Sequence, residues 1–396
     1  MNRIIRKTGL LAGFCLLATT AISQKINVKD TPWEGDEIHR IPAYRVVAED
    51  SIQSIHFEGL PYKGHTKQVF AFYATPGMLK GDRSVDKKLP GVVLVHGGGG
   101  RAFREWVLMW ARRGYAALAI DTRGNGADKQ PIENGFEEGG KETPYFDVTL
   151  PLKEQWVYQA VGDVVMSHTL LLNFPEVDRK RTALTGISWG GVLTCIAASV
   201  DSRFRAAVPV YGCGFLGESG RMKQQLDKLP SSQRDVWLSL YDPSVYLPRA
   251  KCPVLFLNGT NDVHFYLPSM ARSAALVSGG QALVKYKLRH GHGHGWNNQE
   301  IGTFIDHHLS GGPSLPEIKS LRLHDGVITV KAVSPLSIQK VTLYYTTDQQ
   351  EDQEKCEWHF VEAVPDGKEW KAVFPKNAVR WFVNATDRNG NQISGR

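Results

Sequence analysis

Residues 182–192, TALTGISWGGV, place a Gly-x-Ser-x-Gly pattern between a short apolar run and a segment of helical composition. In this setting the flanking glycines permit a sharp turn from strand to helix, so that the hydroxyl of Ser188 projects above the end of a sheet. The start of the following helix favours negative charge nearby. The pattern therefore predicts a nucleophilic serine on a strand–turn–helix unit, with the backbone N–H of Trp189 available to an oxyanion.

The region around this turn, from about residue 66 to 309, alternates between two periodicities. Short runs rich in Val, Ile and Leu are separated by segments of helical period, among them 103–113, 156–172 and 299–309. This alternation is typical of a mostly parallel sheet flanked by helices. The predicted strands are 69–73, 92–96, 116–121, 182–185, 206–210, 254–258 and 283–288. We therefore predict an α/β catalytic domain over residues 24–310, in which residues 24–60 form an extension without a clear pattern.

The pattern changes after the glycines and proline of residues 311–313. From residue 315 onward, segments such as GVITVKAV, KVTLYYTTD and VRWFVNATD alternate apolar and polar residues with the period of strands. An Asn-Gly pair near the C-terminus is typical of a tight hairpin turn. We predict a small all-β sandwich of the immunoglobulin or fibronectin kind over residues 315–396.

The first 23 residues have the pattern of a signal peptide. The basic segment MNRIIRK precedes an apolar run over residues 8–21, and Ala21-Ile22-Ser23 places small residues where a signal peptidase reads. A membrane anchor is the alternative, but a bilayer-spanning helix needs about 20 apolar residues. We expect cleavage after Ser23 and export to the periplasm or the exterior, without stable membrane insertion.

The net charge indicates which classes of partner are disfavoured, and the cysteine positions indicate whether disulfide bonds are expected. The formal net charge is +7, of which three positive charges lie in the predicted signal peptide. This moderate charge favours neither nucleic-acid binding nor a strongly anionic partner. The cysteines of the mature chain lie far apart in predicted core segments, so we expect free, buried thiols rather than a disulfide framework; they are Cys195, Cys213, Cys252 and Cys356.

A second motif, GVVLVHGGGG at residues 91–100, ends a predicted strand in His96 and four glycines. Glycines let backbone amides approach a developing oxyanion without obstruction by side chains. A phosphate-binding loop would carry a Lys-Ser or Lys-Thr pair, which is missing here. We predict that Gly98 and Gly99 donate to the oxyanion, with Gly97 as the alternative.

The serine needs a base that is itself oriented by a carboxylate, and in this kind of fold the acid precedes the base in the chain. Residues 254–262, VLFLNGTND, form a buried strand that ends in a turn, which places Asp262 at the same edge of the sheet as Ser188. An aspartate in a turn can instead simply cap the backbone. We predict Asp262 as the acid, and Asp242 and Asp306 are weaker candidates.

The base must come from LRHGHGHGW, residues 288–296, directly after the last predicted strand. Three imidazoles in it could reach the edge of the sheet, and Gly-His-Gly occurs around both His292 and His294, so spacing alone does not separate these two. We select His292, followed by His294 and then His290. The alternating histidines could instead bind zinc with His264 or Asp262, but a zinc site leaves the serine turn and the glycine loop unexplained. No metal and no cofactor is therefore predicted.

Taken together, HGGGG, DTRGNG, FPEVDRKRTALTGISWGG, CPVLFLNGTND and HGHGHGW resemble bacterial acetyl xylan esterases and dienelactone-hydrolase-like proteins of the α/β-hydrolase superfamily, over about residues 60–310. HGGGG by itself also resembles esterases of the hormone-sensitive-lipase type. The resemblance implies a triad of Ser188, Asp262 and His292 that acts on an ester. The chain departs from the family pattern in its three alternating histidines and its additional β-sandwich.

These features predict an exported serine carboxylic-ester hydrolase that removes acetyl groups from a plant polysaccharide or oligosaccharide. A methylesterase acting on pectic uronate esters would use the same residues. A prolyl-oligopeptidase-like peptidase is less favoured, because the residues ahead of the α/β domain are too few for the propeller that such peptidases carry. The non-enzymatic alternative is an inactive glycan-binding protein in which the sandwich is the functional part.

Overall fold

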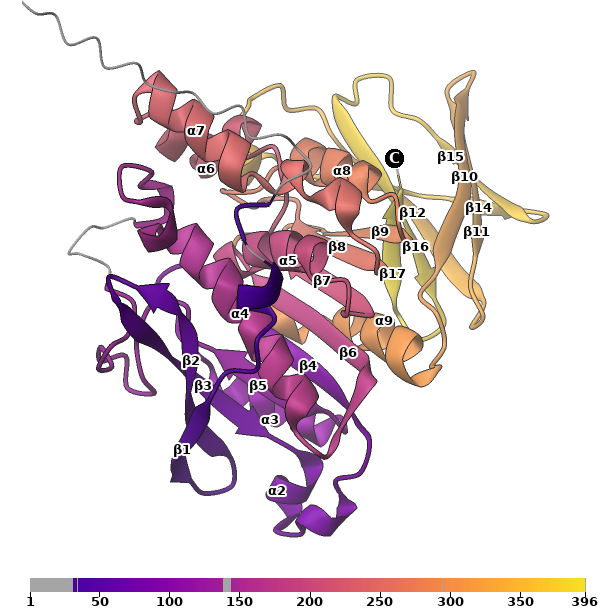
Figure 1. Ribbon diagram of the computed structural model, residues 1–396. Coiled ribbons are helices and arrows are strands. Elements are labelled where there is room, and N and C mark those ends of the chain that lie inside the picture. The colour runs from indigo at the N-terminus through magenta and orange to yellow at the C-terminus, as the bar shows by residue number, and fades with distance from the viewer. Residues whose placement is uncertain (1–30, 34, 138–143, 294, 396) are drawn as a thin grey trace, which may run out of the picture. The chain divides into compact units, whose positions relative to one another are not determined.

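The computed structural model describes residues 31–33, 35–137, 144–293 and 295–395, and Thr31–Arg396 form one compact unit (Figure 1). The predicted signal peptide and its cleavage position lie outside the described residues, as does His294. Within the described ranges, no helix is both long and apolar enough to cross a bilayer.

A large mixed sheet forms the centre of the molecule. Its parallel part consists of β5, β4, β6, β7, β8 and β9 in this spatial order, and an antiparallel group, β1, β2 and β3, continues it beside β5. The predicted α/β-hydrolase arrangement is therefore present. The bounds are β1 (Tyr44–Glu49), β2 (Gln53–Tyr62), β3 (His65–Ala74), β4 (Leu89–Val95), β5 (Ala116–Ile120), β6 (Val177–Ile187), β7 (Ala206–Val210), β8 (Val254–Gly259) and β9 (Ala282–Lys287).

Helices cover both faces of this sheet (Figure 1). On one face α4 and α5 pack against each other and against β6, and their almost entirely buried residues reflect the continuous apolar runs of the sequence. On the other face α3 and α9 are joined by Arg113, whose Nε donates to Asp306 at 3.0 Å. The bounds are α3 (Arg104–Arg112), α4 (Trp156–Asn173), α5 (Trp189–Val200), α8 (Leu267–Leu276) and α9 (Gln299–Ser310).

All seven predicted strands and the three predicted helices are present. Strands β3, β4 and β6 begin several residues earlier than predicted, and the bounds of the other elements agree to within one residue. The sequence did not predict the hairpin of β1 and β2. Every residue of β1 is exposed, so no apolar alternation marks it. Two helices between β7 and β8, α6 (Gly220–Leu226) and α7 (Ser231–Tyr241), were also not predicted, since their apolar stripes are short. Two short N-terminal helices, α1 (Gly35–Ile38) and α2 (Pro76–Lys80), complete this part.

The C-terminal residues form two antiparallel layers, as the alternating pattern predicted. One layer is β10 (Glu317–His324), β11 (Val327–Val333), β15 (Glu369–Val373) and β14 (Val364–Asp366); the other is β17 (Gln392–Gly395), β16 (Arg380–Asp387), β12 (Ile338–Thr346) and β13 (His359–Glu362). A small apolar core from both layers separates them; it includes Ile328, Val330, Val341, Leu343, Val383 and Ala385. A small all-β part therefore follows the α/β part.

No pattern in the sequence indicated that one of these layers continues the central sheet. Strand β17 pairs with β9 at Ser394 and Val284, and the hydroxyl of Ser394 accepts the N–H of Tyr286 at 2.8 Å. Nearby, the buried carboxylate of Glu300 on α9 accepts the N–H of Gln392 at 3.0 Å. The division of the chain near residue 312 and the immunoglobulin-like nature of the sandwich stay predictions, because these contacts join the two parts through one sheet.

Candidate active site

Ser188 occupies a strained turn between β6 and α5. Its backbone has φ 56° and ψ −120°, and its N–H donates to the carbonyl of Val210 at 2.8 Å. The neighbouring glycines are required sterically: a Cβ on Gly186 would lie 2.2 Å from the carbonyl oxygen of Gly190, and a Cβ on Gly190 would lie 2.1 Å from that of Val95. The turn is therefore possible only because these side chains are absent, as the sequence pattern predicted.

His292 links Ser188 to Asp262. Its Nε2 lies 2.8 Å from Oγ of Ser188, and its Nδ1 lies 2.7 Å from Oδ2 of Asp262. Asp262 is fully buried, and its Oδ1 accepts the backbone N–H groups of His264 at 2.7 Å and Phe265 at 2.8 Å. Because a carboxylate only accepts, Nδ1 of His292 carries the proton and Nε2 offers a lone pair to the serine hydroxyl.

The other described histidine of the same segment has a different partner. Nε2 of His290 is hydrogen-bonded to the hydroxyl of Tyr211, and the two rings stack with their centroids 5.8 Å apart. Burial lowers the pKa of His290 and raises that of Tyr211, whose hydroxyl stays protonated. Of the two histidines that the structure describes, only His292 lies between the serine and an acid.

The carboxylates of the two weaker candidates for the acid are hydrogen-bonded to groups away from His292. Asp242 accepts the backbone N–H groups of Phe215 at 2.9 Å and Leu216 at 2.7 Å and so caps a turn. Asp306 binds Arg113 on the far side of the sheet. Neither of these carboxylates is hydrogen-bonded to His292.

The glycine loop after β4 lies directly against the serine, since a Cβ on Gly97 would be 2.9 Å from Cβ of Ser188. His96 holds this loop. Its Nδ1 lies 2.7 Å from the carbonyl oxygen of Gly97, and its Nε2 accepts the N–H of Thr122 at 3.0 Å. The buried imidazole therefore donates through Nδ1 and accepts through Nε2, which fixes the loop relative to the end of β5.

The predicted oxyanion donors differ in their surroundings. A Cβ on Gly98 would lie 2.5 Å from Cδ1 of Trp189, so these two residues sit side by side. The N–H of Gly99 donates to the hydroxyl of Tyr145 at 3.1 Å. Tyr145 escaped sequence analysis because no motif surrounds it; only the packing of its ring against Trp189, with centroids 4.8 Å apart, brings it to the site.

Comparison with known proteins finds a matching family and solved structures of similar fold. Residues 49–244 match the acetyl xylan esterase (AXE1) family, a match that ends before Asp262 and His292. The solved acetyl xylan esterase from Paenibacillus sp. R4 superposes with a TM-score of 0.57 at 24% identity, covering 71% of this chain and 96% of that one. The chain has the α/β-hydrolase fold. The fold that the resemblance of the motifs implied is thereby confirmed, and the family match is consistent with the prediction of an ester hydrolase.

Other similar proteins extend the comparison. Acetyl xylan esterase 1 from Thermoanaerobacterium sp. JW/SL YS485 superposes on this α/β-hydrolase with a TM-score of 0.53 at 17% identity, covering 68% of this chain and 90% of that one. Curated relatives include an uncharacterized peptidase, YuxL, of Bacillus subtilis (strain 168), 30% identical over 140 residues, and the acylamino-acid-releasing enzyme of Rattus norvegicus, 28% identical over 193 residues. These matches cover 34% and 44% of this chain, and the chain spans only 18% and 24% of those two proteins.

His264 is a further histidine beside His292. Its ring centroid lies 4.6 Å from that of His292. Burial, followed by the proximity of His292, lowers the pKa of His264 to about 4. The neutral imidazole therefore adds no positive charge beside His292 at neutral pH. In the part of the chain that the structure describes, no group of three or more His, Cys, Asp or Glu side chains is arranged to hold a metal ion.

A cavity of about 360 Å³ is lined by both polar and apolar residues. The polar residues are His65, Arg123, Asn125, Asn134 and Glu137, and the apolar residues include Pro131, Ile132 and Phe136. Nη1 of Arg123 lies 3.9 Å from the position that a Cβ on Gly99 would take. One residue of the cavity wall, Arg123, therefore approaches the glycine loop that lies against Ser188.

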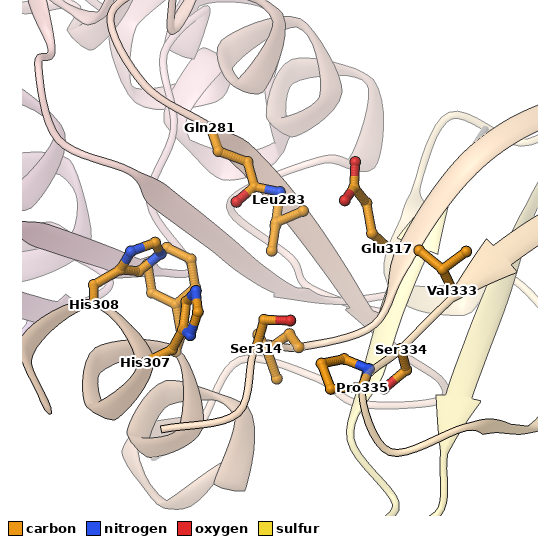
Figure 2. Close-up of a pocket in the computed structure, with 11 residues that line it drawn as sticks. Gln281, Leu283, His307, His308, Ser314, Glu317, Val333, Ser334 and Pro335 are labelled. Atoms are coloured by element: carbon orange, nitrogen blue, oxygen red, sulfur yellow. The ribbon is translucent and has the colours of Figure 1, made fainter. Parts of the chain in front are cut away.

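A larger cavity, of about 460 Å³, lies where the end of α9 and the start of β9 meet the C-terminal layers. Figure 2 shows His307, His308 and Glu317 among the side chains that line it. It is at the N-terminal end of β9, whereas Ser188, Asp262 and His292 all follow the C-terminal ends of parallel strands. This cavity is therefore separate from the candidate active site.

Proposed function

We propose that the protein is an exported serine carboxylic-ester hydrolase that removes acetyl groups from a plant polysaccharide or oligosaccharide. The hydrogen-bonded chain from Ser188 through His292 to Asp262, with distances of 2.8 Å and 2.7 Å, is the observation that carries the proposal. The match to the acetyl xylan esterase family, which includes Ser188, supports ester hydrolysis.

In the proposed reaction, Oγ of Ser188 attacks the ester carbonyl carbon while Nε2 of His292 takes the hydroxyl proton. Asp262 stabilises the imidazolium through Nδ1–H and keeps the ring in the required tautomer. The proton then passes from Nε2 to the departing sugar oxygen as the acyl-enzyme forms. Water, deprotonated by the same nitrogen, attacks the acyl-enzyme, and the carboxylic acid leaves as Ser188 regains its proton.

The negative charge of the tetrahedral intermediate requires preorganised donors. We assign this role to the backbone N–H groups of Trp189 and Gly98, because these two residues lie side by side next to Ser188. Gly99 remains a third proposed donor, although its N–H must leave the hydroxyl of Tyr145, or be shared with it, to reach an oxyanion. Gly97 is the alternative to Gly98.

The choice of a carbohydrate ester has two supports. Acetyl xylan esterases are the named function of the matching family. The cavity lined by Arg123 presents amide, imidazole, guanidinium and carboxylate groups together with apolar residues such as Phe136, a combination that suits a ligand with both hydroxyl groups and apolar faces, as a sugar has. Export, which rests on the N-terminal sequence pattern, would place the enzyme where such glycans occur.

A second candidate function is peptide hydrolysis, favoured by the two curated relatives named as peptidase and acylamino-acid-releasing enzyme. It is weaker, because the chain spans about a quarter or less of those proteins. A methylesterase would use the same residues on a different ester. An inactive glycan-binding protein would not require the hydrogen-bonded chain at Ser188.

The test is proton NMR of acetylated xylan and of acetylated, methyl-esterified pectin, each incubated with wild type and with Ser188→Ala. We expect acetate release by wild type and none by the variant. Methanol release without acetate would move the function to the methylesterase, and cleavage of an acetyl-amino-acid anilide alone would move it to the peptidase. If wild type leaves all of these substrates and a simple aryl acetate intact, hydrolysis at this site is refuted.

A further inference from the structure

The loop between β12 and β13, residues 347–358, reaches from the C-terminal layers to the segments that carry Asp262 and His292. A short 3₁₀ helix, Gln353–Lys355, forms its centre. The side chain of Gln353 is only 2% exposed, although it sits in a connecting loop. A buried polar side chain in such a position requires hydrogen-bond partners, and both of its polar atoms point into the α/β part.

Gln353 contacts both ends of the acid-bearing segment. Its Oε1 accepts the N–H of Leu267, the first residue of α8, at 2.9 Å. Its Nε2 lies 3.4 Å from the carbonyl oxygen of Gly259, the last residue of β8. The segment between these two points carries Asp262. The side-chain amide of Gln353 therefore holds the acid-bearing segment at both ends, where it follows β8 and where it enters α8.

Asn261 makes the reciprocal contact. Its Nδ2 donates to the carbonyl oxygens of Glu354 and Cys356, both at 2.9 Å. Asn261 immediately precedes Asp262, so these bonds fix the backbone next to the buried carboxylate. The acid-bearing segment and the 347–358 loop thus hold each other through two exchanged side-chain amides.

The segment that carries the histidines is held in the same way. Nη2 of Arg289 donates to the carbonyl oxygen of Trp358 at 2.8 Å, and the N–H of Arg289 donates to the hydroxyl of Thr260, also at 2.8 Å. The N–H of Asn261 donates to the carbonyl of His290 at 3.2 Å. The three loops therefore form one hydrogen-bonded unit, with Asp262 and His292 inside it.

We propose that the 347–358 loop of the C-terminal β part positions the acid and the base of this hydrolase, and that Gln353 and Asn261 are its positioning residues. The inference rests on the proposed function of Ser188, Asp262 and His292. It differs from a glycan-binding role for the sandwich, because glycan binding would leave hydrolysis of a small ester unchanged. Positioning matters because displacing a reacting group by about 1 Å costs on the order of 100-fold in rate.

The test uses the full chain and p-nitrophenyl acetate, a substrate too small to reach a distant glycan site. In Gln353→Met the side-chain volume is kept and both hydrogen bonds are lost. We expect kcat to fall about 10-fold to 100-fold with KM changed less than about 3-fold, because a displaced acid affects the chemical step more than binding. Gln349→Met is the matched control, since the same substitution falls on an exposed residue of the same loop and leaves kcat at the wild-type value.

A purely structural role of Gln353 would give a different result. Titration of Ser188 with diethyl p-nitrophenyl phosphate counts competent sites, and the rate of phosphorylation reports on the serine itself. Positioning predicts a full titre with slow phosphorylation, and Asn261→Ala should behave likewise. Wild-type kcat in Gln353→Met, or a low titre with wild-type kcat per site, would overturn the proposal. If Ser188 is phosphorylated but p-nitrophenyl acetate is not hydrolysed, the proposed function fails, and the phosphorylation rate still tests the positioning.

Discussion

The buried carboxylate of Asp262 has two separable tasks, and Asp262→Asn removes one of them. Oδ1 accepts two backbone N–H groups, from His264 and Phe265, at 2.7 Å and 2.8 Å, while Oδ2 faces Nδ1 of His292 at 2.7 Å. An asparagine can keep its oxygen on the two backbone donors. Turning its NH₂ group toward them would leave two buried donors unsatisfied, at about 1–3 kcal/mol each. The amide nitrogen of the variant therefore faces His292.

This orientation inverts the hydrogen bonding of His292. An amide N–H opposite Nδ1 requires Nδ1 to accept, so the ring proton moves to Nε2, the atom that must take the proton of Ser188. We expect kcat for p-nitrophenyl acetate to fall by about 10³-fold to 10⁴-fold, which corresponds to about 4–5.5 kcal/mol of transition-state stabilisation. KM should change little, because Asp262 is fully buried behind His292.

Asp242→Asn provides the matched control. Asp242 is also buried and also accepts backbone N–H groups, from Phe215 and Leu216, but it is not hydrogen-bonded to a histidine. This variant should lower the melting temperature and leave kcat within a few-fold of wild type. The assays are steady-state kinetics and thermal unfolding followed by circular dichroism. If Asp262→Asn retained more than a tenth of the wild-type kcat, the reasoning about the proton on His292 would be wrong.

Four further predictions follow from the same contacts. His290→Ala should keep most of the wild-type kcat while His292→Ala loses about 10³-fold or more, and equal losses would reverse the assignment of the base. Gly190→Ala should lower the melting temperature by several degrees or prevent folding, because its Cβ would lie 2.1 Å from the carbonyl oxygen of Val95; an unchanged melting temperature would contradict this steric reading. Burial lowers the pKa of His308 from 6.5 to about 4. As the pH falls through this interval, the unfolded chain takes up a proton before the folded chain does, so the folded state loses stability. His308→Gln should reduce this loss of stability, measured as the difference in the free energy of urea unfolding between pH 7 and pH 5. Exhaustive treatment with a chelator should leave kcat unchanged, and a loss that zinc restores would favour the metal alternative.

The local turn at Ser188 could be predicted because its requirements are encoded within a few residues. Only glycine fits at 186 and 190, where a side chain would meet the backbone at 2.2 Å and 2.1 Å. The parallel strands could likewise be predicted, since a strand buried on both faces has a continuous run of apolar residues in the sequence. The prediction of Asp262 as the acid followed from its position at the end of such a strand.

The choice among the histidines could be made from the sequence only as a preference. His290 and His292 lie two residues apart in one glycine-rich segment, and they differ in what lies opposite: Tyr211 for the first, Ser188 and Asp262 for the second. The hydrogen bond between Gly99 and Tyr145 likewise could not be predicted from the sequence, because the two residues are far apart in the chain and come together through packing around Trp189.

The sequence by itself determined the kind of fold, the strained serine turn and the order in which Ser188, Asp262 and His292, the proposed nucleophile, acid and base, follow the ends of parallel strands. These properties depend on backbone sterics and on the period of apolar residues, which neighbouring residues define. Only the tertiary structure decided which histidine faces the serine, that β17 continues the central sheet beside β9, and that Gln353 reaches Gly259 and Leu267. Those contacts join segments about a hundred residues apart, and their geometry exists only when all the intervening elements are packed.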